Sequence, residues 1–249
     1  RLPLQPCPPH RLAGAAESRL ARAPAMTELR VPSARFNTVG EAVRAAEAGS
    51  VIYVAPGLYN ECVTLNRALT LVGDVRGTRF GGKHGEVVIG AVSVTASAIG
   101  VEDEPEGTRK PHPLWHFDDE ARRGQGGARA SDMTVELQAV TLRGSANRAT
   151  VDVMSGKVVL EDCALRAAMG CSVSTCLKLG HGCASWLVRC ELSHANLGVA
   201  AVGGKVTLER CVSTGLHRAV VEARAGARVL LTECDLRGGD GVGACSAAG

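Results

Sequence analysis

The sequence feature that most constrains the fold is a short phrase that recurs four times in the second half of the chain. Each copy reads apolar-x-Leu-x-x-Cys, with Ser in the apolar position of the second copy, and the copies end at Cys163, Cys190, Cys211 and Cys234. Successive cysteines lie 21 to 27 residues apart. A repeat of this length is typical of solenoid proteins, in which each repeat forms one stacked coil. The phrase therefore predicts an elongated solenoid.

The pattern also predicts which side chains point outward. Residues 135–140 have the same phrase with Val140 in the cysteine position, so five consecutive coils align. Within each phrase we expect the first residue, the leucine and the cysteine to point inward, with a bend between the leucine and the cysteine. The outward row is then Val159, Trp186, Thr207 and Leu230, and a charged row of Asp162, Arg189, Arg210 and Glu233 runs beside it.

A second strand is expected after the phrase in each coil. These strands are predicted at residues 150–153, 171–173, 199–201, 220–222 and 242–244. We expect turns into the next coil at Gly156, Gly203–Gly204 and Gly226, because glycine readily adopts positive φ. Residues 175–182 are expected to form an extra loop in the fourth coil.

The N-terminal part predicts a capping helix followed by short strands. Apolar residues fall at helical spacing over 39–48, Thr38 is suited as the N-cap with Glu41 three residues later, and Gly49 ends the helix. Strands are predicted at residues 51–54, 62–65, 69–72, 87–89 and 92–94. A turn is expected at Pro56–Gly57. Because a solenoid exposes an apolar layer at its end, we expect the helix to cover that layer.

Several stretches of this N-terminal part resemble the opening of a known fold family. They are FNTVGEAV at 36–43, then Ala46, GSVIYVAPGLYNE at 49–61 and LTLVG at 69–73. In this order they resemble the start of the pectin lyase-like family. The resemblance implies an all-β, right-handed parallel β-helix of about seven coils with a short N-terminal capping helix. That family contains pectate lyases, pectin methylesterases and polygalacturonases, and also the non-catalytic intracellular β-helix domains of F-box-associated and SHC-binding proteins.

A charged insertion interrupts the coils at residues 102–131. It contains three prolines and ends in Gly124-Gln-Gly-Gly127, a composition typical of a loop. Trp115 and Phe117 form an apolar patch inside it. Two interpretations of the patch remain open, since it would either pin the loop against the solenoid or contribute to a binding surface.

The catalytic groups of the family's enzymes provide a test of activity. Residues 138–143, QAVTLR, resemble the Gln-Ala-Val-Ala-Leu motif of pectin methylesterases, but the Gln-Asp-Thr and Trp-Gly-Arg-Pro-Trp motifs of those enzymes are missing. Without paired aspartates there is neither a nucleophile nor an acid, so we expect no catalytic residues. The alternative is a carbohydrate-active enzyme that acts on an acidic polysaccharide, with Gln138, Arg143 and Asp152 on one flank.

The expected function is therefore recognition or scaffolding through the outward row. Trp186, Thr207 and Leu230, with Trp115 and Phe117 nearby, would contact a protein or glycan partner. The C-terminal end has no evident cap, so we expect either that the chain is a fragment or that a partner covers this end. The residues Cys171, Cys176, His181 and Cys183 conform only partly to the spacing of a zinc site, so neither a metal nor a cofactor is expected.

Composition bounds the partners and the compartment. Outside residues 1–25 the chain has 24 basic and 24 acidic side chains, which argues against a nucleic-acid-binding protein. No apolar run is long enough to span a membrane, and the ten cysteines fit free thiols, so a cytoplasmic protein is expected. Residues 1–25 are interpreted as a disordered leader or as translated sequence upstream of Met26, before a β-helix domain at 26–249. If they are a transit peptide, the protein belongs in an organelle.

Overall fold

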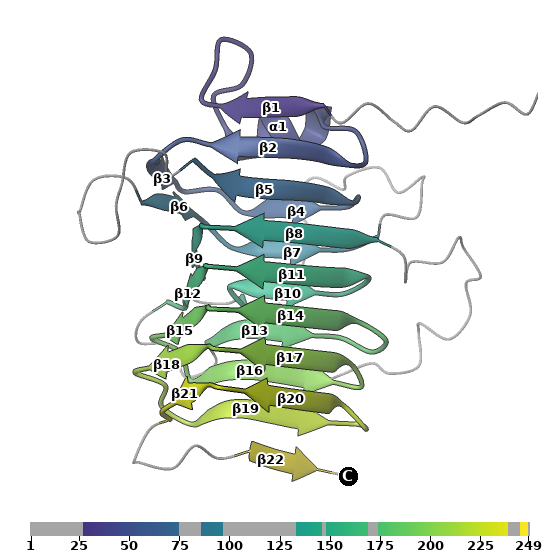
Figure 1. The fold of residues 1–249 in the computed structure, drawn as a ribbon, viewed down its shortest axis with the longest axis vertical. Helices are drawn as coiled ribbons and strands as arrows, with labels where there is room; N and C mark the ends of the chain where they lie inside the picture. The colour runs from purple at the N-terminus through teal and green to yellow at the C-terminus, as the bar shows by residue number, and fades with distance from the viewer. Residues whose placement is uncertain are drawn as a thin grey trace, which may run out of the picture.

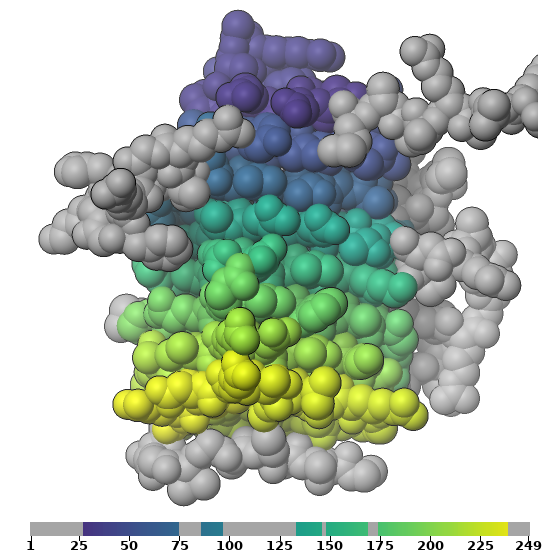
Figure 2. Space-filling view, in the orientation of Figure 1, coloured from purple at the N-terminus to yellow at the C-terminus, as the bar shows by residue number. Residues whose placement is uncertain are grey.

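The chain folds as a right-handed parallel β-helix, as the sequence predicts (Figure 1). A computed structural model describes residues 27–74, 86–96, 133–145, 148–168 and 174–238, together with the backbone of residues 245–248. These residues form seven coils of three strands each, preceded by one further strand and one helix. Figure 2 shows the coils stacked from the N-terminal helix end to the C-terminal end.

Three parallel sheets run along the stack, and we name them from the view in Figure 1. The front sheet contains β1 (Glu28–Val31), β2 (Ser50–Val54), β5 (Leu69–Gly73), β8 (Thr134–Gln138), β11 (Lys157–Glu161), β14 (Ala184–Val188), β17 (Lys205–Glu209) and β20 (Arg228–Thr232). The side sheet contains β3 (Gly57–Tyr59), β6 (Val87–Ile89), β9 (Thr141–Arg143), β12 (Ala164–Arg166), β15 (Glu191–Ser193), β18 (Val212–Thr214) and β21 (Asp235–Leu236). The rear sheet contains β4 (Val63–Leu65), β7 (Val92–Val94), β10 (Val151–Val153), β13 (Thr175–Leu179), β16 (Leu197–Val202), β19 (Ala219–Arg224) and β22 (Cys245–Ala248).

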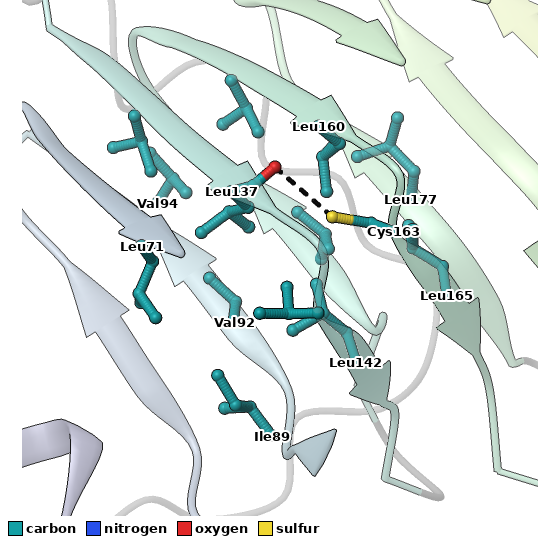
Figure 3. Close-up of a cluster of buried hydrophobic side chains, with 14 of the residues drawn as sticks. Leu71, Ile89, Val92, Val94, Leu137, Leu142, Leu160, Cys163, Leu165 and Leu177 are labelled. Atoms are coloured by element: carbon teal, nitrogen blue, oxygen red, sulfur yellow. Dashed lines mark hydrogen bonds between the residues drawn. The ribbon is translucent and has the colours of Figure 1, made fainter. Parts of the chain in front are cut away.

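The repeated phrase forms each front strand and the corner that follows it. Val158, Leu160 and Cys163 are all buried, as predicted, and the next buried residue, Leu165, already belongs to the side sheet (Figure 3). The bend is a single residue in the left-handed region, with φ of 52–53° at Ala139, Asp162, Arg189, Arg210 and Glu233. This residue breaks the alternation of a strand and turns the chain from the front sheet to the side sheet.

The four repeated cysteines form a ladder of free thiols at this corner, and all but Cys234 are buried. Each sulfur donates a hydrogen bond to the carbonyl of the leucine one coil earlier, at 3.3 Å from Cys163 to Leu137 and at 3.4 Å in the other three coils. Figure 3 shows the first of these bonds inside the apolar core. The ladder thus joins successive coils and leaves its thiols paired with backbone oxygens.

Helix α1 (Val39–Ala45) caps the N-terminal end and is held at both of its ends. Thr38 and Glu41 form the predicted capping box. In addition, Glu61 accepts hydrogen bonds from the backbone N–H groups of Val39 at 2.7 Å and Gly40 at 2.8 Å. At the other end Arg67 donates to the carbonyl of Ala46 at 2.7 Å. A carboxylate at the N-terminus and a guanidinium at the C-terminus both complement the helix dipole.

Three predictions about the elements need correction. The helix ends at Ala45 instead of residue 48, because Ala46 already has an extended backbone. Residues 175–179, expected in a loop, form β13, in register with β10 and β16, because Leu177 and Leu179 supply the buried side chains of that coil. The turn expected at Pro56–Gly57 runs directly into β3. Neither β1 nor the side-sheet strands β9, β12, β15, β18 and β21 were predicted, because only one strand was expected after the phrase in each coil.

Other predicted segments fall outside the described residues. They are residues 1–25, 102–131, 171–173 and 242–244. Among the predicted turns, Gly156, Gly203 and Gly226 do have positive φ, at 81°, 66° and 73°. Within the described ranges no helix is long and apolar enough to cross a membrane.

Candidate functional site

The predicted outward row is present on the front sheet. Val159 pairs with Trp186, Trp186 with Thr207, and Thr207 with Leu230, on four successive strands. Trp186 is 49% exposed and Leu230 is 55% exposed. Trp186 lies between the buried residues Ser185 and Leu187, whereas Leu230 lies on β20, where Leu231 is itself 39% exposed and Val229 is only partly buried. Two large apolar side chains exposed on one row make it the first candidate for a binding surface.

A groove lies beside Trp186 on this face, and we call it the Trp186 groove. Its volume is about 180 Å³, and the side chains that shape it include Thr134, Lys157, Val159, Ala184, Trp186, Lys205 and Thr207. Ala184 is the small residue between Lys157 and Lys205 in the same register, so the strand of Trp186 leaves space where its neighbours carry long side chains. The groove therefore has an aromatic side, two ammonium groups and hydroxyl groups within reach.

A basic row borders the groove on the side where the front strands begin. Lys157, Ala184, Lys205 and Arg228 occupy the same register on β11, β14, β17 and β20. All three cationic side chains are exposed. Among the described residues, none of the three forms an ion pair with a carboxylate. This row is available to bind negative charge.

On the opposite side of the groove, the arginines of the charged row are instead paired with carboxylates of neighbouring coils. Arg189 donates to both carboxylate oxygens of Asp162, at 2.7 and 2.8 Å, and to Glu161 at 2.6 Å. One coil later Arg210 donates to Glu233 at 2.7 Å. Asp162 contributes most to the rise of the pKa of Arg189 above its ordinary value, and Glu233 does the same for Arg210. The predicted ladder of acids and bases is present.

The residues of the enzyme alternative do not come together. Gln138 ends β8 on the front sheet, Arg143 ends β9 on the side sheet, and Asp152 lies in β10 on the rear sheet. The expectation that they share one flank is wrong, because they fall on three successive strands of a single coil, and those strands face three directions. Asp152 instead lies in register with Ser93 and Lys178.

The residues considered as zinc ligands differ in their burial. The sulfur of Cys176 is buried and donates to the carbonyls of Leu165 and Ser193, and Cys183 is buried immediately before the next front strand, β14. His181 is exposed at the turn between them, and Cys171 lies outside the described residues. In the described part of the chain, no three His, Cys, Asp or Glu side chains are grouped so that they could hold a metal ion.

The basic row was missed in the sequence, although a signal for it exists. Each of its members is the residue immediately before a copy of the repeated phrase. Aligning the phrases one residue further upstream places Lys157, Lys205 and Arg228 in one column. Trp115 and Phe117, the other predicted binding residues, lie outside the described residues.

Comparison with known proteins shows similarity at the level of the backbone. No protein-family model matches the chain, and no curated protein matches it. Pectin methylesterase PemA from Erwinia chrysanthemi is similar in structure, with 16% sequence identity and a TM-score of 0.42 over 85% of this chain and 67% of that one. A mutant pectin methylesterase in complex with a hexasaccharide has 15% identity and a TM-score of 0.39, over 82% of this chain and 66% of that one. The activity of this chain has to be argued from its own residues.

Proposed function

We propose that this β-helix is a non-catalytic recognition module that binds a protein or glycan partner along its front sheet. The observation that carries the proposal is the Trp186 groove, in which a half-exposed indole lies beside two lysines that have no described acidic partner. Tryptophan at the centre of a surface is among the residues that contribute most to binding when a partner covers it. The rigid solenoid holds the groove in place before any partner arrives.

The surrounding carboxylates support binding over catalysis. Hydrolysis or elimination on a polysaccharide needs an acid and a base placed together on the reacting bond. Glu161, at the end of β11, and Asp162, at the corner that follows, are both held by Arg189. Asp152, the carboxylate of the enzyme alternative, lies on another sheet from the groove. Glu161 and Asp162 are therefore occupied by an ion pair between coils, and Asp152 is too far around the coil to act with them.

The proposal is tested through the fluorescence of Trp186. The chain has two tryptophans, so the Trp115→Phe variant reports on Trp186 alone. It is titrated with polygalacturonate, a neutral β-glucan, poly-glutamate and poly-lysine. We expect at least one of these polymers to change the emission in a saturable way, and the same binding, followed by calorimetry, to be lost in Trp186→Ala.

Two results would contradict the proposal. One is the absence of a saturable change with any of the polymers. The other is release of methanol or unsaturated uronides from pectin by the purified chain, which would make it an enzyme. A matched control for the surface is Lys178→Ala, because Lys178 is exposed on the rear sheet, away from the groove.

A further inference from the structure

We propose that the natural occupant of the Trp186 groove is an acidic polypeptide segment in an extended conformation, with apolar side chains three residues apart. This inference rests on the proposed function, because it names the partner class of the same surface. Three features carry it: the chemistry of the exposed row, the position of the unpaired cations and the spacing of both along the stack.

The apolar chemistry of the row favours a polypeptide over a glycan. Leu230 is more exposed than Trp186 and lies two strands further along the same row. An indole stacks well on a sugar ring, but an aliphatic side chain gains most from contact with other aliphatic or aromatic side chains. A polypeptide can cover both Trp186 and Leu230 with apolar side chains.

The charges favour an acidic segment that lies toward one side of the row. Lys157, Lys205 and Arg228 border the row where the strands begin, without described acidic partners. On the other side, Arg189 and Arg210 are already paired with carboxylates. Among the described residues, a segment with Asp or Glu beside its apolar residues would therefore find cations without an acidic partner on one side of the row only, and this asymmetry sets its orientation.

The spacing of the row matches an extended chain. Trp186 and Leu230 are separated by one intervening strand, as are Lys157 and Lys205. With neighbouring strands about 4.8 Å apart, each pair spans about 10 Å. A polyproline II segment has three residues per turn and rises about 3.1 Å per residue, so residues i and i+3 lie on one face about 9 Å apart. Apolar residues at i and i+3 would thus reach Trp186 and Leu230 together.

The test is a selection of peptides followed by titration. A random peptide library displayed on phage is selected on the full chain, after depletion on the Trp186→Ala variant. We expect the retained peptides to be enriched in Asp and Glu and to carry apolar residues three apart. A synthetic peptide from this set, and the same peptide with each acidic residue changed to its amide, are then titrated against the Trp115→Phe variant.

The expected loss of affinity for each variant follows from how central its side chain is in the proposed contact. Trp186→Ala should weaken binding by roughly 30-fold or more, as for a central aromatic anchor. Leu230→Ala should weaken it by about ten-fold. Lys157→Ala and Lys205→Ala should each cost roughly two- to five-fold, as exposed charges do. Lys178→Ala, which removes the same charge from the rear sheet, should leave the affinity unchanged, and the amide peptide should bind more weakly.

The outcomes separate this inference from the proposed function. If polygalacturonate binds in a Trp186-dependent way and no acidic peptide does, the polypeptide assignment is overturned while recognition through the groove stands. If the retained peptides show no acidic bias, or bind Lys157→Ala and Lys205→Ala as well as the parent chain, the assignment is likewise overturned. If neither peptide nor glycan affects Trp186, both proposals fail.

Discussion

Arg189 holds Asp162 of the preceding coil through two parallel hydrogen bonds, from Nε to Oδ1 at 2.7 Å and from Nη2 to Oδ2 at 2.8 Å. Both residues occupy the corner of their coil, with φ of 52° and 53°. The same position of the repeat therefore has two roles. Its backbone turns the chain between two sheets, and its side chain ties one coil to the next.

At this position the backbone role should matter more than the ion pair. Asp162→Val puts a β-branched residue into the left-handed region, which costs an ordinary residue roughly 1–2 kcal/mol and is least tolerated by β-branched ones. Asp162→Asn loses the charge but keeps a residue type that adopts this conformation readily. In urea denaturation we expect the Val variant to be less stable than the Asn variant by about 1–2 kcal/mol. Equal stability of the two would show that the corner tolerates any side chain.

Loss of the thiol at Cys211 should reduce stability and leave binding intact. Cys211 is fully buried, and its sulfur donates to the carbonyls of Leu187 and Glu209, each at 3.4 Å. Cys211→Ala removes these contacts and leaves a small cavity, at a cost of about 1–2 kcal/mol. The same change at Cys234, which is partly exposed, should cost less. Urea denaturation measures both, and Trp186 fluorescence should report unchanged affinity for any groove ligand. A loss of affinity with unchanged stability would contradict this.

The repeated phrase predicted most of the fold because its buried positions are apolar in nearly every coil. Inward side chains, the cysteine ladder and the outward row all follow from a strand that alternates until it reaches a corner. The fourth coil was harder to predict, because β13 starts with Thr175 and Cys176, which do not continue the apolar pattern of the other rear strands. Its register became clear only once its neighbours β10 and β16 were in place.

The sequence predicted a bend between Leu137 and Val140, but it did not predict how far the chain turns there. Gln138 and Arg143 lie on either side of that bend, and the residue at the corner is Ala139, a residue type with no preference for positive φ. In later coils the corner is Asp, Arg, Arg or Glu, and of these only Asp adopts positive φ at all readily. Each corner is held by the stacking of coils, a long-range effect, so the change of sheet is not evident from the local sequence. The Trp186 groove likewise depends on Ala184 lying between two lysines of neighbouring coils.

The stability of the cap helix should depend on Glu61, a residue outside the helix. Glu61 is 21 and 22 residues from the two N–H groups that it accepts, so it ties α1 to the first coil. Glu61→Ala leaves both donors without this partner and should cost about 1–2 kcal/mol. Hydrogen exchange at Val39 and Gly40 should become faster. Glu47→Ala, at an exposed position just after the helix, is the control and should leave the exchange rates unchanged. Equal effects of the two variants on the exchange rates would contradict the capping role of Glu61.

The buried thiol of Cys176 should resist alkylation in the folded protein. Burial raises the pKa of Cys176 to about 12, so little reactive thiolate forms at neutral pH or at about pH 9, near the pKa of an ordinary thiol. Cys62 is exposed and should be labelled by iodoacetamide first. Peptide mass spectrometry measures both sites, and in urea they should react alike. Comparable labelling of the two cysteines in the folded protein would show that the coil around Cys176 opens readily.

The raised pKa of Cys176 also predicts how stability changes at alkaline pH. The folded state holds this thiol neutral, whereas the unfolded chain ionises it near pH 8.5. Its contribution to stability is therefore complete below about pH 8.5 and is lost as the pH rises from there toward 12. The free energy of unfolding should fall over this range, and Cys176→Ala, although less stable at neutral pH, should show a shallower fall. An identical pH dependence in the two proteins would mean that Cys176 does not titrate on unfolding.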